Sequence, residues 1–379
     1  MFGIQPWFQP LPQGGDHGWD VEHIFCKKWT ETMRINNKLK PALFFGLVTS
    51  ISLPADASYE VQIGEQDTLI FGGYIKADVR YVDGNVAYKD QWTGAGTPLD
   101  QSASQFRIFA NETRFNTKYI HGDLVGFIEM DFFGDGGNQI ISNSTQPRLR
   151  HAFIQYQNVL AGQTWTTFMN TSAIGESADF GGSMMGISFV RQGQIRYTNG
   201  GLQLALENPE SFGGDTANDK LPDVIVKYTF KGDWGNVSIA AVGRQLNTTG
   251  GNTETAVGGS IAGRIYTFGK DDLRIQYHQG ELGRYVGTAA VKDLVGEQVE
   301  DTTAYNVAYR HFWTESLRST LLYGHIEGDV SGNETSQWGV NLFTNLTPEL
   351  SVGAEVGNYS IDHEDKDAFY GQFSVRYAL

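Results

Sequence analysis

Apolar and polar residues alternate with a period of two from Thr68 to the last residue of the chain. Successive side chains of a β-strand point to opposite faces, so each alternating segment predicts a strand with one apolar and one polar side. No window after residue 57 has the length and composition of a transmembrane helix. The chain is therefore expected to be all-β, built from strands that each need an apolar environment on one face only.

The alternating segments also predict how the strands are connected. Sixteen segments lie near residues 68–82, 104–120, 122–133, 148–157, 158–165, 189–199, 201–207, 221–230, 235–245, 255–267, 272–280, 302–312, 316–326, 335–346, 349–360 and 367–379. Short turns alternate with longer polar stretches, among them 83–103, 134–146, 166–188 and 281–301. Short turns on one rim and long loops on the other are typical of an outer-membrane barrel. We expect a sixteen-stranded antiparallel transmembrane β-barrel of a Gram-negative outer membrane.

The composition agrees with this fold and argues against one class of partner. Charged residues make up 19% of the chain and aromatic residues 13%, with 46 Gly against 10 Pro, a profile of strand and turn formers. The mean hydropathy of -0.32 is compatible with a membrane barrel, because only alternate residues face lipid. The net charge of -15 argues against nucleic acid as a partner, since binding nucleic acid requires a basic face.

Residues 33–57 have the three-part organisation of a Sec signal peptide. A basic stretch precedes the apolar stretch 42–48, which is too short to be a transmembrane helix, and a small-x-small cleavage site ends the segment at Ala57. We expect export with cleavage after Ala57, leaving residues 58–379 as the barrel domain. Residues 1–32 are interpreted as an upstream start-site artefact or, alternatively, as an extended n-region.

The final segment carries the most specific signal in the chain. Its presumed outward side consists of Phe369, Gly371, Phe373, Val375, Tyr377 and Leu379. A closing strand with outward aromatic residues resembles the signal that is read by the barrel-insertion machinery, although the usual last residue there is Phe rather than Leu. The alternative, an edge strand of a soluble sandwich, would leave this aromatic face exposed and prone to pairing.

Three further segments carry a family resemblance. They read Arg-Leu-Arg-His-Ala-Phe-Ile-Gln-Tyr from Arg148, Leu-Ala-Gly-Gln-Thr-Trp-Thr-Thr-Phe-Met from Leu160, and Arg-Gln-Gly-Gln-Ile-Arg-Tyr from Arg191. Together they resemble the DcaP-like family of trimeric porins, most densely over residues 104 to 200. The resemblance implies sixteen-stranded trimers that pass small organic acids. The periplasmic coiled coil of some members is not expected here, because no heptads lie between Ala57 and the first strand.

The stretch 166–188 contains apolar residues that a surface loop does not need. We expect it to fold into the barrel as a constriction loop and to bury the following residues against the wall: Phe168, Met169, Ile174, Phe180, Met184 and Met185. This arrangement resembles the third, constricting loop of general porins.

Arginines in the strands around this loop are the candidate pore residues. A charged side chain facing mid-bilayer lipid costs about 2–4 kcal/mol, so these arginines should face water or a subunit interface. The candidates are Arg107, Arg114, Arg148, Arg150 and Arg196 in the strands, with Glu176 and Asp179 in the loop. Arginines facing loop carboxylates would set a transverse field that favours anions. The alternative is that each arginine only pairs with a neighbouring carboxylate to fill the barrel.

Other polar residues are interpreted as structural or solvated rather than as binding or catalytic residues. His151 is interpreted as a polar residue buried between subunits, and the strand around it, with a less clearly apolar outward face, predicts a homotrimer. Asp271-Asp272 and the run from His363 to Asp367 are interpreted as solvated turn charge rather than cation sites. No catalytic residue, cofactor or metal is expected, and the only cysteine, Cys26, precedes the predicted cleavage site.

The function expected from the sequence is passive diffusion of small hydrophilic solutes through an outer-membrane porin. Organic anions such as dicarboxylates are the expected solutes, and outer-membrane lipid and lipopolysaccharide are the expected surroundings. One alternative is a barrel hydrolase, which would need an oriented nucleophile that no motif here supplies. The others are a closed structural or adhesion barrel and a soluble lectin-like protein, although sixteen strands generally leave an aqueous bore.

Overall fold

The computed structural model describes residues 58–379 except 88–96, 135–137, 139 and 181–184. The predicted signal peptide, its cleavage site after Ala57 and the segment 1–32 therefore involve residues outside the described part. None of the helices in the described residues is long and apolar enough to cross a membrane.

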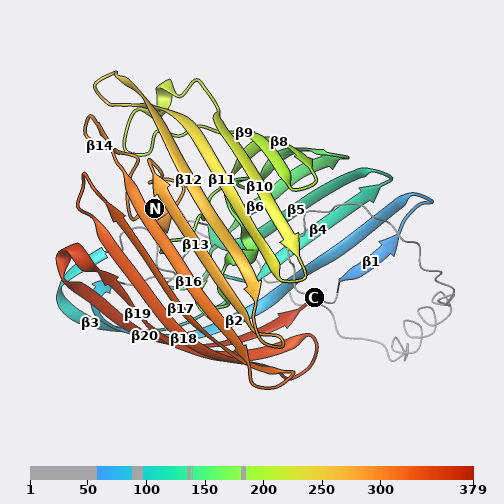
Figure 1. The fold of residues 1–379 in the computed structure, drawn as a ribbon. Helices are drawn as coiled ribbons and strands as arrows, with labels where there is room; N and C mark the ends of the chain where they lie inside the picture. Colours follow the sequence, from blue (N-terminus) through green and yellow to red (C-terminus); the bar gives the residue numbers. More distant parts are fainter. Residues whose placement is uncertain (1–57, 88–96, 135–137, 139, 181–184) are drawn as a thin grey trace, which may run out of the picture. The chain divides into compact units, whose positions relative to one another are not determined.

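The described strands form a closed antiparallel barrel (Figure 1). Its sixteen wall positions are β2 (Asp67–Ala87), β3 (Thr97–Phe109) continued by β4 (Arg114–His121), β5 (Leu124–Gly134), β6 (Gln146–Tyr156), β7 (Val159–Trp165), β8 (Arg191–Asn199), β9 (Leu202–Glu207), β10 (Asp223–Gly232), β11 (Gly235–Asn247), β12 (Thr253–Tyr266), β13 (Asp272–Gly280), β16 (Thr302–Phe312), β17 (Leu317–Gly328), β18 (Glu334–Asn345), β19 (Leu350–Ile361) and β20 (Lys366–Ala378). Strand β2 closes the ring, since it pairs with β20 on one side and with β3 and β4 on the other.

A few short elements lie outside these wall positions. Strand β1 (Tyr59–Gln62) pairs with the start of β2, and β14 (Leu294–Val295) pairs with β15 (Gln298–Val299) inside a loop. The described 3-10 helices are η1 (Thr171–Ala173), η2 (Thr216–Asn218), η3 (Gly287–Ala289) and η4 (Asp362–Glu364).

The predicted fold class is confirmed, and each of the sixteen predicted segments overlaps one wall position. The largest difference is at the first long loop, where 83–103 was expected to be irregular. Strand β2 continues to Ala87 and β3 begins at Thr97, so the two strands pair beyond a bulge at Gly84 and Val86. Hydrogen bonding between the strands thus continues where the apolar alternation has ended.

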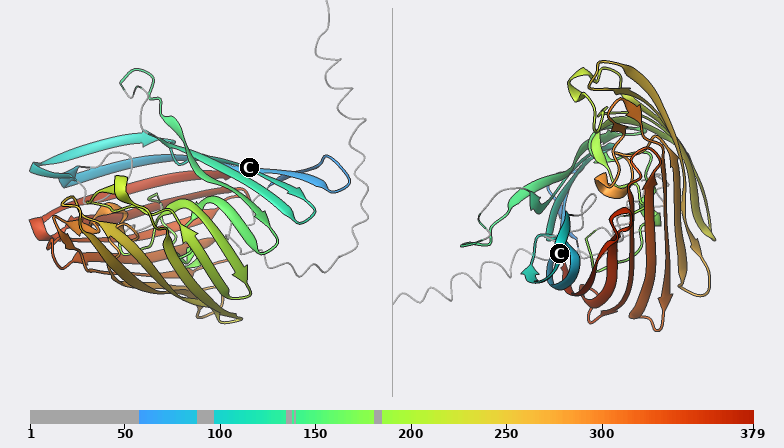
Figure 2. Two further views of the ribbon diagram at one scale, coloured as in Figure 1. Left: turned by 90° about the horizontal axis from the view of Figure 1, so that it is seen from above. Right: turned by 90° about the vertical axis from the view of Figure 1, so that its left-hand side faces the viewer.

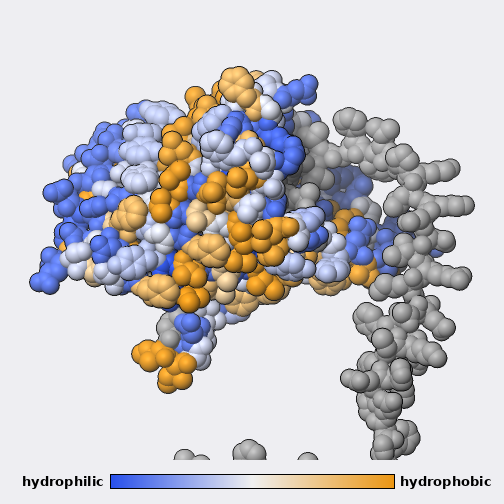
Figure 3. Space-filling model, turned by 90° about the horizontal axis from the view of Figure 1, so that it is seen from below, coloured by the Kyte–Doolittle hydropathy of each residue, from blue (hydrophilic) through white to orange (hydrophobic). Residues whose placement is uncertain are grey.

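The outer face of the barrel is apolar in a band, as alternation requires. Exposed apolar side chains recur on every second residue, for example Ile239, Ile261, Tyr277, Val307, Leu321, Val340, Val356 and Phe373. Figure 3 shows apolar residues gathered across one outer face, with hydrophilic residues covering the long-loop end. In water this band would be an aggregation liability, whereas in a bilayer it matches the hydrocarbon.

The inner face of the same strands is polar and carries paired charges. Lys76, Asp78, Arg80, Glu129 and Glu355 are all buried inside the barrel. Figure 2 looks into the barrel from the long-loop end and shows loops lying inside it. Tight turns close the opposite rim, where Gly122 (φ 53°) and Gly200 (φ 60°) take the left-handed backbone that such turns require.

Candidate pore constriction

The segment between β7 and β8 folds into the barrel. It begins with a turn in which the Asn170 side chain accepts a hydrogen bond from the Ser172 N–H and caps helix η1. Phe168, Met169, Phe180 and Met185 are buried, and Ile174 is half-buried. The expected burial is confirmed for these residues, whereas Met184 lies outside the described part of the chain. Apolar residues in this loop therefore pack against the inner wall.

Side chains of the wall hold this constriction loop by its backbone carbonyls. Lys227 Nζ donates to the Met169 carbonyl at 2.8 Å and Lys76 Nζ donates to the Ala178 carbonyl at 2.8 Å. Further side-chain amides donate to the loop from Gln276, Asn306 and Asn341, at 3.1, 3.1 and 2.8 Å. These donors come from β2, β10, β13, β16 and β18. The donors lie on strands from β10 round to β2, so the loop is tied at many points along this part of the wall, which fixes its position across the bore.

The loop carboxylates pair with arginines of that same wall. Glu176 accepts from Arg318 at 2.7 Å and lies 3.3 Å from Arg310. Asp179 accepts from Arg80 at 2.6 Å, in a pair whose side chains are both buried. The two acids were expected to oppose the candidate pore arginines. Each has a different arginine as its ion-pair partner, so much of its charge is neutralised locally.

Four arginines gather on the other wall, from β4, β6 and β8. Arg148 donates two hydrogen bonds to Asp131, at 3.0 and 2.8 Å, and Arg150 donates to Glu129 and Asp131, both at 2.8 Å. The Cζ atoms of Arg114, Arg148 and Arg150 each lie 5.7 Å from the centre of the Phe180 ring. Three guanidinium groups therefore lie within cation–π distance of the Phe180 ring.

Arg191 is the fourth member of this cluster, which we call the arginine cluster (Arg114, Arg148, Arg150 and Arg191). Its Cζ lies 4.5 Å from the centre of the Trp165 ring. Arg191 Nη1 and Arg114 Nε are buried and have no hydrogen-bond partner among the described residues. Arg191 was not among the predicted pore residues, although it lies three residues after the end of the expected loop. Arg191 could have been identified as a pore residue from its position near the start of the predicted strand that follows the constriction loop.

A cavity of about 680 Å³ lies beside the loop and the arginine cluster. Its charged lining consists of Lys76, Arg114, Lys118, Arg150, Arg318 and Arg376 against Glu112, Glu129, Glu176 and Asp179. Aromatic side chains, including Tyr74, Phe127 and Trp165, line it as well. The lining side chains therefore carry six basic groups against four acidic groups, a formal excess of two positive charges.

Three of the predicted pore residues, Arg107, Arg148 and Arg196, do not line this cavity, although Arg148 lies beside it in the arginine cluster. Arg107 on β3 is half-buried and stands opposite Arg80 in the β2–β3 register. Arg196 on β8 is directly opposite Ala205 and lies within electrostatic range of Glu207 and Lys227. The structure thus brings Arg114, Arg148 and Arg150 together, and places Arg107 and Arg196 elsewhere on the inner wall.

A bulge in β6 explains where His151 lies. Glu129 pairs with His151 and Met130 pairs with Leu149, so Arg150 is the extra residue. Arg150 and His151 are both buried, and His151 lies 3.0 Å from Thr164 Oγ1 and lines the cavity. The interpretation of His151 as an interface residue is wrong, because a bulge turns two consecutive side chains to the same face.

The pair Asp271-Asp272 is also not solvated. Asp272 is buried and accepts hydrogen bonds from Arg264, Arg274 and Arg310. Asp271 lies in the turn before β13, where the Phe312 N–H and His311 hold its pKa below the usual range. Arginine ion pairs account for Asp272 and hydrogen bonds account for Asp271, so the expectation of solvated turn charge is wrong here.

A second loop also enters the barrel, which the sequence analysis did not predict. The stretch 281–301 was expected to be a long outer loop, yet Leu282, Tyr285 and Val286 are completely buried. The Phe189 N–H donates to the Tyr285 carbonyl at 3.2 Å, and Ser188 forms a β-bridge with Val286. This second loop therefore packs on the constriction loop and narrows the bore from the long-loop side.

Buried ion pairs fasten the second loop to the wall. Arg244 on β11 donates to Asp293 of the loop at 2.6 and 2.9 Å and to Asp223 of β10 at 3.2 Å. The Tyr285 hydroxyl donates to Asp223 at 2.7 Å. Because charge-assisted hydrogen bonds are strong when their groups are buried, Arg244 is the central tie of this loop.

A closed barrel of sixteen wall strands, with an apolar outer band, a polar bore and an inward loop, defines the porin class of outer-membrane channels. The sequence matches the family model of the DcaP outer membrane protein over residues 55–337, and the chain belongs to this family. No curated protein matches the sequence.

Solved structures show the same fold at low sequence identity. The outer membrane channel DcaP of Acinetobacter baumannii is 21% identical, with a TM-score of 0.74 over 85% of this chain and 100% of that chain. Salmonella typhi OmpF in complex with daunomycin is 16% identical, with a TM-score of 0.56 over 85% and 100%. An anion-selective porin from Comamonas acidovorans is 14% identical, with a TM-score of 0.54 over 83% and 100%.

Proposed function

We propose that this outer-membrane porin passes small hydrophilic solutes by passive diffusion and favours organic anions such as dicarboxylates. The observation that carries the proposal is the arginine cluster at the constriction. Arg114 and Arg191 each keep a guanidinium nitrogen without a hydrogen-bond partner among the described residues. The positive charge of these two guanidinium groups is therefore not fully satisfied by hydrogen bonds within the described residues, and it attracts a solute carboxylate at close range.

The balance of charge at the constriction supports the same direction. Arg148 and Arg150 share Glu129 and Asp131 as ion-pair partners, whereas Arg114 and Arg191 form no ion pair of their own among the described residues and Arg114 lies within electrostatic range of Glu112. The loop acids Glu176 and Asp179 pair with Arg318 and Arg80 instead. Basic side chains outnumber acidic ones in the cavity lining, so a carboxylate that enters the cavity meets an excess of positive charge.

The net charge of -15 does not reverse this preference. Charges on loops that face bulk water are screened beyond roughly 8–10 Å at physiological ionic strength. At about 4 Å, a unit charge still contributes about 1 kcal/mol in a water-like medium and more at lower permittivity. Local charge at the constriction thus outweighs the acidic total.

Replacing Arg148 and Arg150 by Gln tests this assignment. The double substitution leaves Glu129 and Asp131 without arginine partners, so the anion-to-cation permeability ratio should fall by about tenfold or more, the equivalent of 1.4 kcal/mol. Succinate uptake into liposomes should slow in parallel. The matched control is Asp329→Asn, which removes an exposed loop charge and should change little. Unchanged selectivity in the arginine variant, with altered selectivity in the control, would contradict the proposal.

A further inference from the structure

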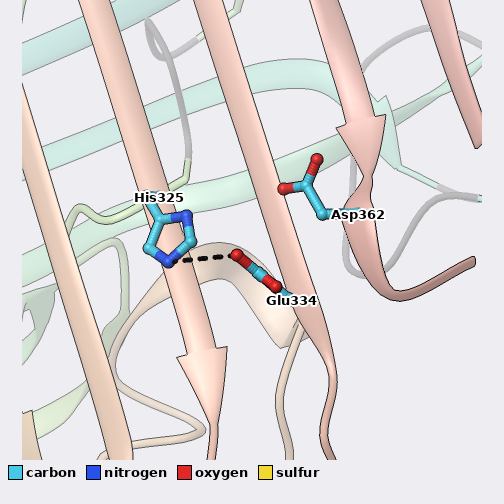
Figure 4. Close-up of side chains that lie close together, drawn as sticks. All are labelled: His325, Glu334 and Asp362. Carbon is cyan, nitrogen blue, oxygen red and sulfur yellow. Dashed lines mark ion pairs between the residues drawn. The ribbon is translucent and has the colours of Figure 1, made fainter. Parts of the chain in front are cut away.

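A histidine and three carboxylates meet at the long-loop rim, away from the bore. His325 and Glu327 lie near the end of β17, Glu334 begins β18, and Asp362 follows β19 in η4. Figure 4 shows His325, Glu334 and Asp362 turned toward one another from neighbouring strands. One ligand atom from each of the three lies within 4.8 Å of the others. None of the four residues lines the cavity at the constriction.

The carboxylates of this group are close to one another without a basic partner. Glu327 and Glu334 are directly opposite in the β17–β18 register, and like charges in that position destabilise a strand pair. Among the described residues, no Lys or Arg forms an ion pair with Glu327, Glu334 or Asp362, whereas His325 approaches two of them. By contrast, the buried carboxylates of the inner wall, such as Asp131 and Asp272, have arginine partners. Among the described residues, His325 is therefore the only basic side chain within ion-pair distance of any of these three carboxylates.

His325 supplies a nitrogen that is already oriented toward these carboxylates. Its imidazole stacks on the Tyr305 ring, with 5.0 Å between centres and 30° between planes, and the residue is only 8% exposed. Its Nε2 lies 3.7 Å from Glu327 Oε2 and 3.8 Å from Glu334 Oε1. These distances are too long for hydrogen bonds. A buried ring nitrogen thus faces two carboxylate oxygens across a gap that an ion would fill.

We propose that His325, Glu334 and Asp362 bind one divalent transition-metal cation of the zinc class, with Glu327 or water completing the coordination. A mixed set of one imidazole nitrogen and carboxylate oxygens suits zinc, whereas calcium and magnesium prefer oxygen ligands alone. Zinc binds these ligands at about 2.0–2.2 Å, so rotations of the flexible Glu and Asp side chains would close the site. The ion would join the ends of three consecutive strands and neutralise the opposed Glu327 and Glu334.

This site differs from the two acidic stretches considered in the sequence. The run from His363 to Asp367 is adjacent, but the Glu334 N–H donates to His363 Nδ1 at 2.9 Å, so that nitrogen is already used. The site is formed only when β17, β18 and β19 are assembled, because its ligands come from separate strand ends. No local sequence motif therefore marks it.

Metal binding to the purified, folded full chain tests the proposal. Equilibrium dialysis against Zn²⁺ should give one bound ion per chain, retained in millimolar Mg²⁺. Co²⁺ in place of zinc should give visible absorption typical of nitrogen and oxygen ligands. His325→Gln and the double variant Glu334→Gln/Asp362→Asn should each weaken binding by about tenfold or more, whereas His363→Gln should keep it. Single-channel conductance should be unchanged in every variant, which verifies folding independently of the transport proposal.

Four results would overturn the assignment. The first is a wild-type chain that binds no zinc, and the second is a folded His325→Gln variant that binds zinc as the wild type does. The third is displacement of the bound ion by millimolar Mg²⁺ or Ca²⁺, which would indicate a nonspecific acidic patch. Loss of binding in His363→Gln alone would equally reject His325 as the ligand.

Discussion

Gly186 allows the constriction loop to touch the barrel wall. Its backbone is left-handed, with φ 73°, and a Cβ at this position would lie 1.9 Å from the Tyr305 carbonyl oxygen and 2.7 Å from that of His325. Neither contact can be relieved by a side-chain rotation, because both atoms belong to wall strands. The close approach of loop and wall therefore depends on glycine at this residue.

Gly186→Ala should destabilise the folded barrel. Left-handed backbone alone costs a non-glycine residue about 1–3 kcal/mol, and the contact with the wall adds to it. The free energy of unfolding, measured by urea titration in detergent, should fall by at least that amount. Gly371→Ala is the matched control, because a Cβ there meets no atom within 4 Å, and it should be nearly neutral. Equal losses in the two variants would contradict the close approach.

The positions of some single side chains could not be predicted from the sequence. Alternation left open whether Arg148 and Arg150 face the bore or a subunit interface, and His151 was interpreted as an interface residue. The bulge at Arg150 turned His151 inward, and no residue pattern in this strand indicates a bulge. Arg191 was missed for a similar reason, since its place beside Arg148 and Arg150 depends on strands that are distant in the sequence.

Among elements, the wall strands were predictable and the inward loops were only partly so. Each strand could be predicted from its own alternation of apolar and polar residues. The inward position of the constriction loop could be predicted from its many apolar residues. The loop 281–301 also contains Leu282, Tyr285, Val286 and Val291, but charged and glycine residues between them hid this pattern. Its position depends on Arg244 and Asp223 of two other strands.

Arg244→Gln should release the second loop. Removing this side chain leaves Asp223 and Asp293 buried without their main partner, and breaking such a pair costs about 3–5 kcal/mol. Hydrogen exchange in residues 281–301 should accelerate, and single-channel conductance should rise as the loop leaves the bore. In the control Arg284→Gln, a weaker pair of 3.7 Å with Asp223 is lost, so the effect should be small. Unchanged exchange in Arg244→Gln would contradict its role as the central tie.

The outward face of β6 does not give the reason for a trimer that the sequence suggested. The outward residues of β6, among them Leu149, Ile154 and Tyr156, are apolar and exposed, so this strand does not present a polar face to lipid. The loop between β5 and β6 offers a different argument. Ile140 and Ile141 are 96% and 85% exposed, and their N–H groups donate to Asn138 Oδ1, which fixes the loop tip.

We propose a homotrimer in which Ile140 and Ile141 contact a neighbouring copy. Two exposed isoleucines on a long-loop tip would be covered in such a contact, because burying them removes apolar surface from water. Unheated detergent electrophoresis should show a trimer, and Ile140→Ser/Ile141→Ser should lower the temperature at which it dissociates. Asp329→Asn, in a different long loop, should leave that temperature unchanged. A wild-type chain that runs only as monomer would reject the assembly.

The general architecture was the most predictable property of the chain, because every strand repeats the same pattern and a barrel satisfies all of them together. Ion selectivity was harder to predict from the sequence, because it depends on which charged side chains lie together in the bore and which of them form ion pairs. The structure brings together Arg114, Arg148, Arg150 and Arg191, and it pairs Glu176 and Asp179 with other arginines. The proposed anion preference rests on that arrangement rather than on the net charge.

The reversal potential of a single wild-type channel in a potassium chloride gradient tests this central claim most directly. If the arginine cluster controls permeation, the reversal potential should have the sign of the chloride equilibrium potential, and its magnitude should decrease as ionic strength rises because the fixed charges are screened. A reversal potential with the sign of the potassium equilibrium potential would mean that the acidic total governs permeation, and it would contradict the account.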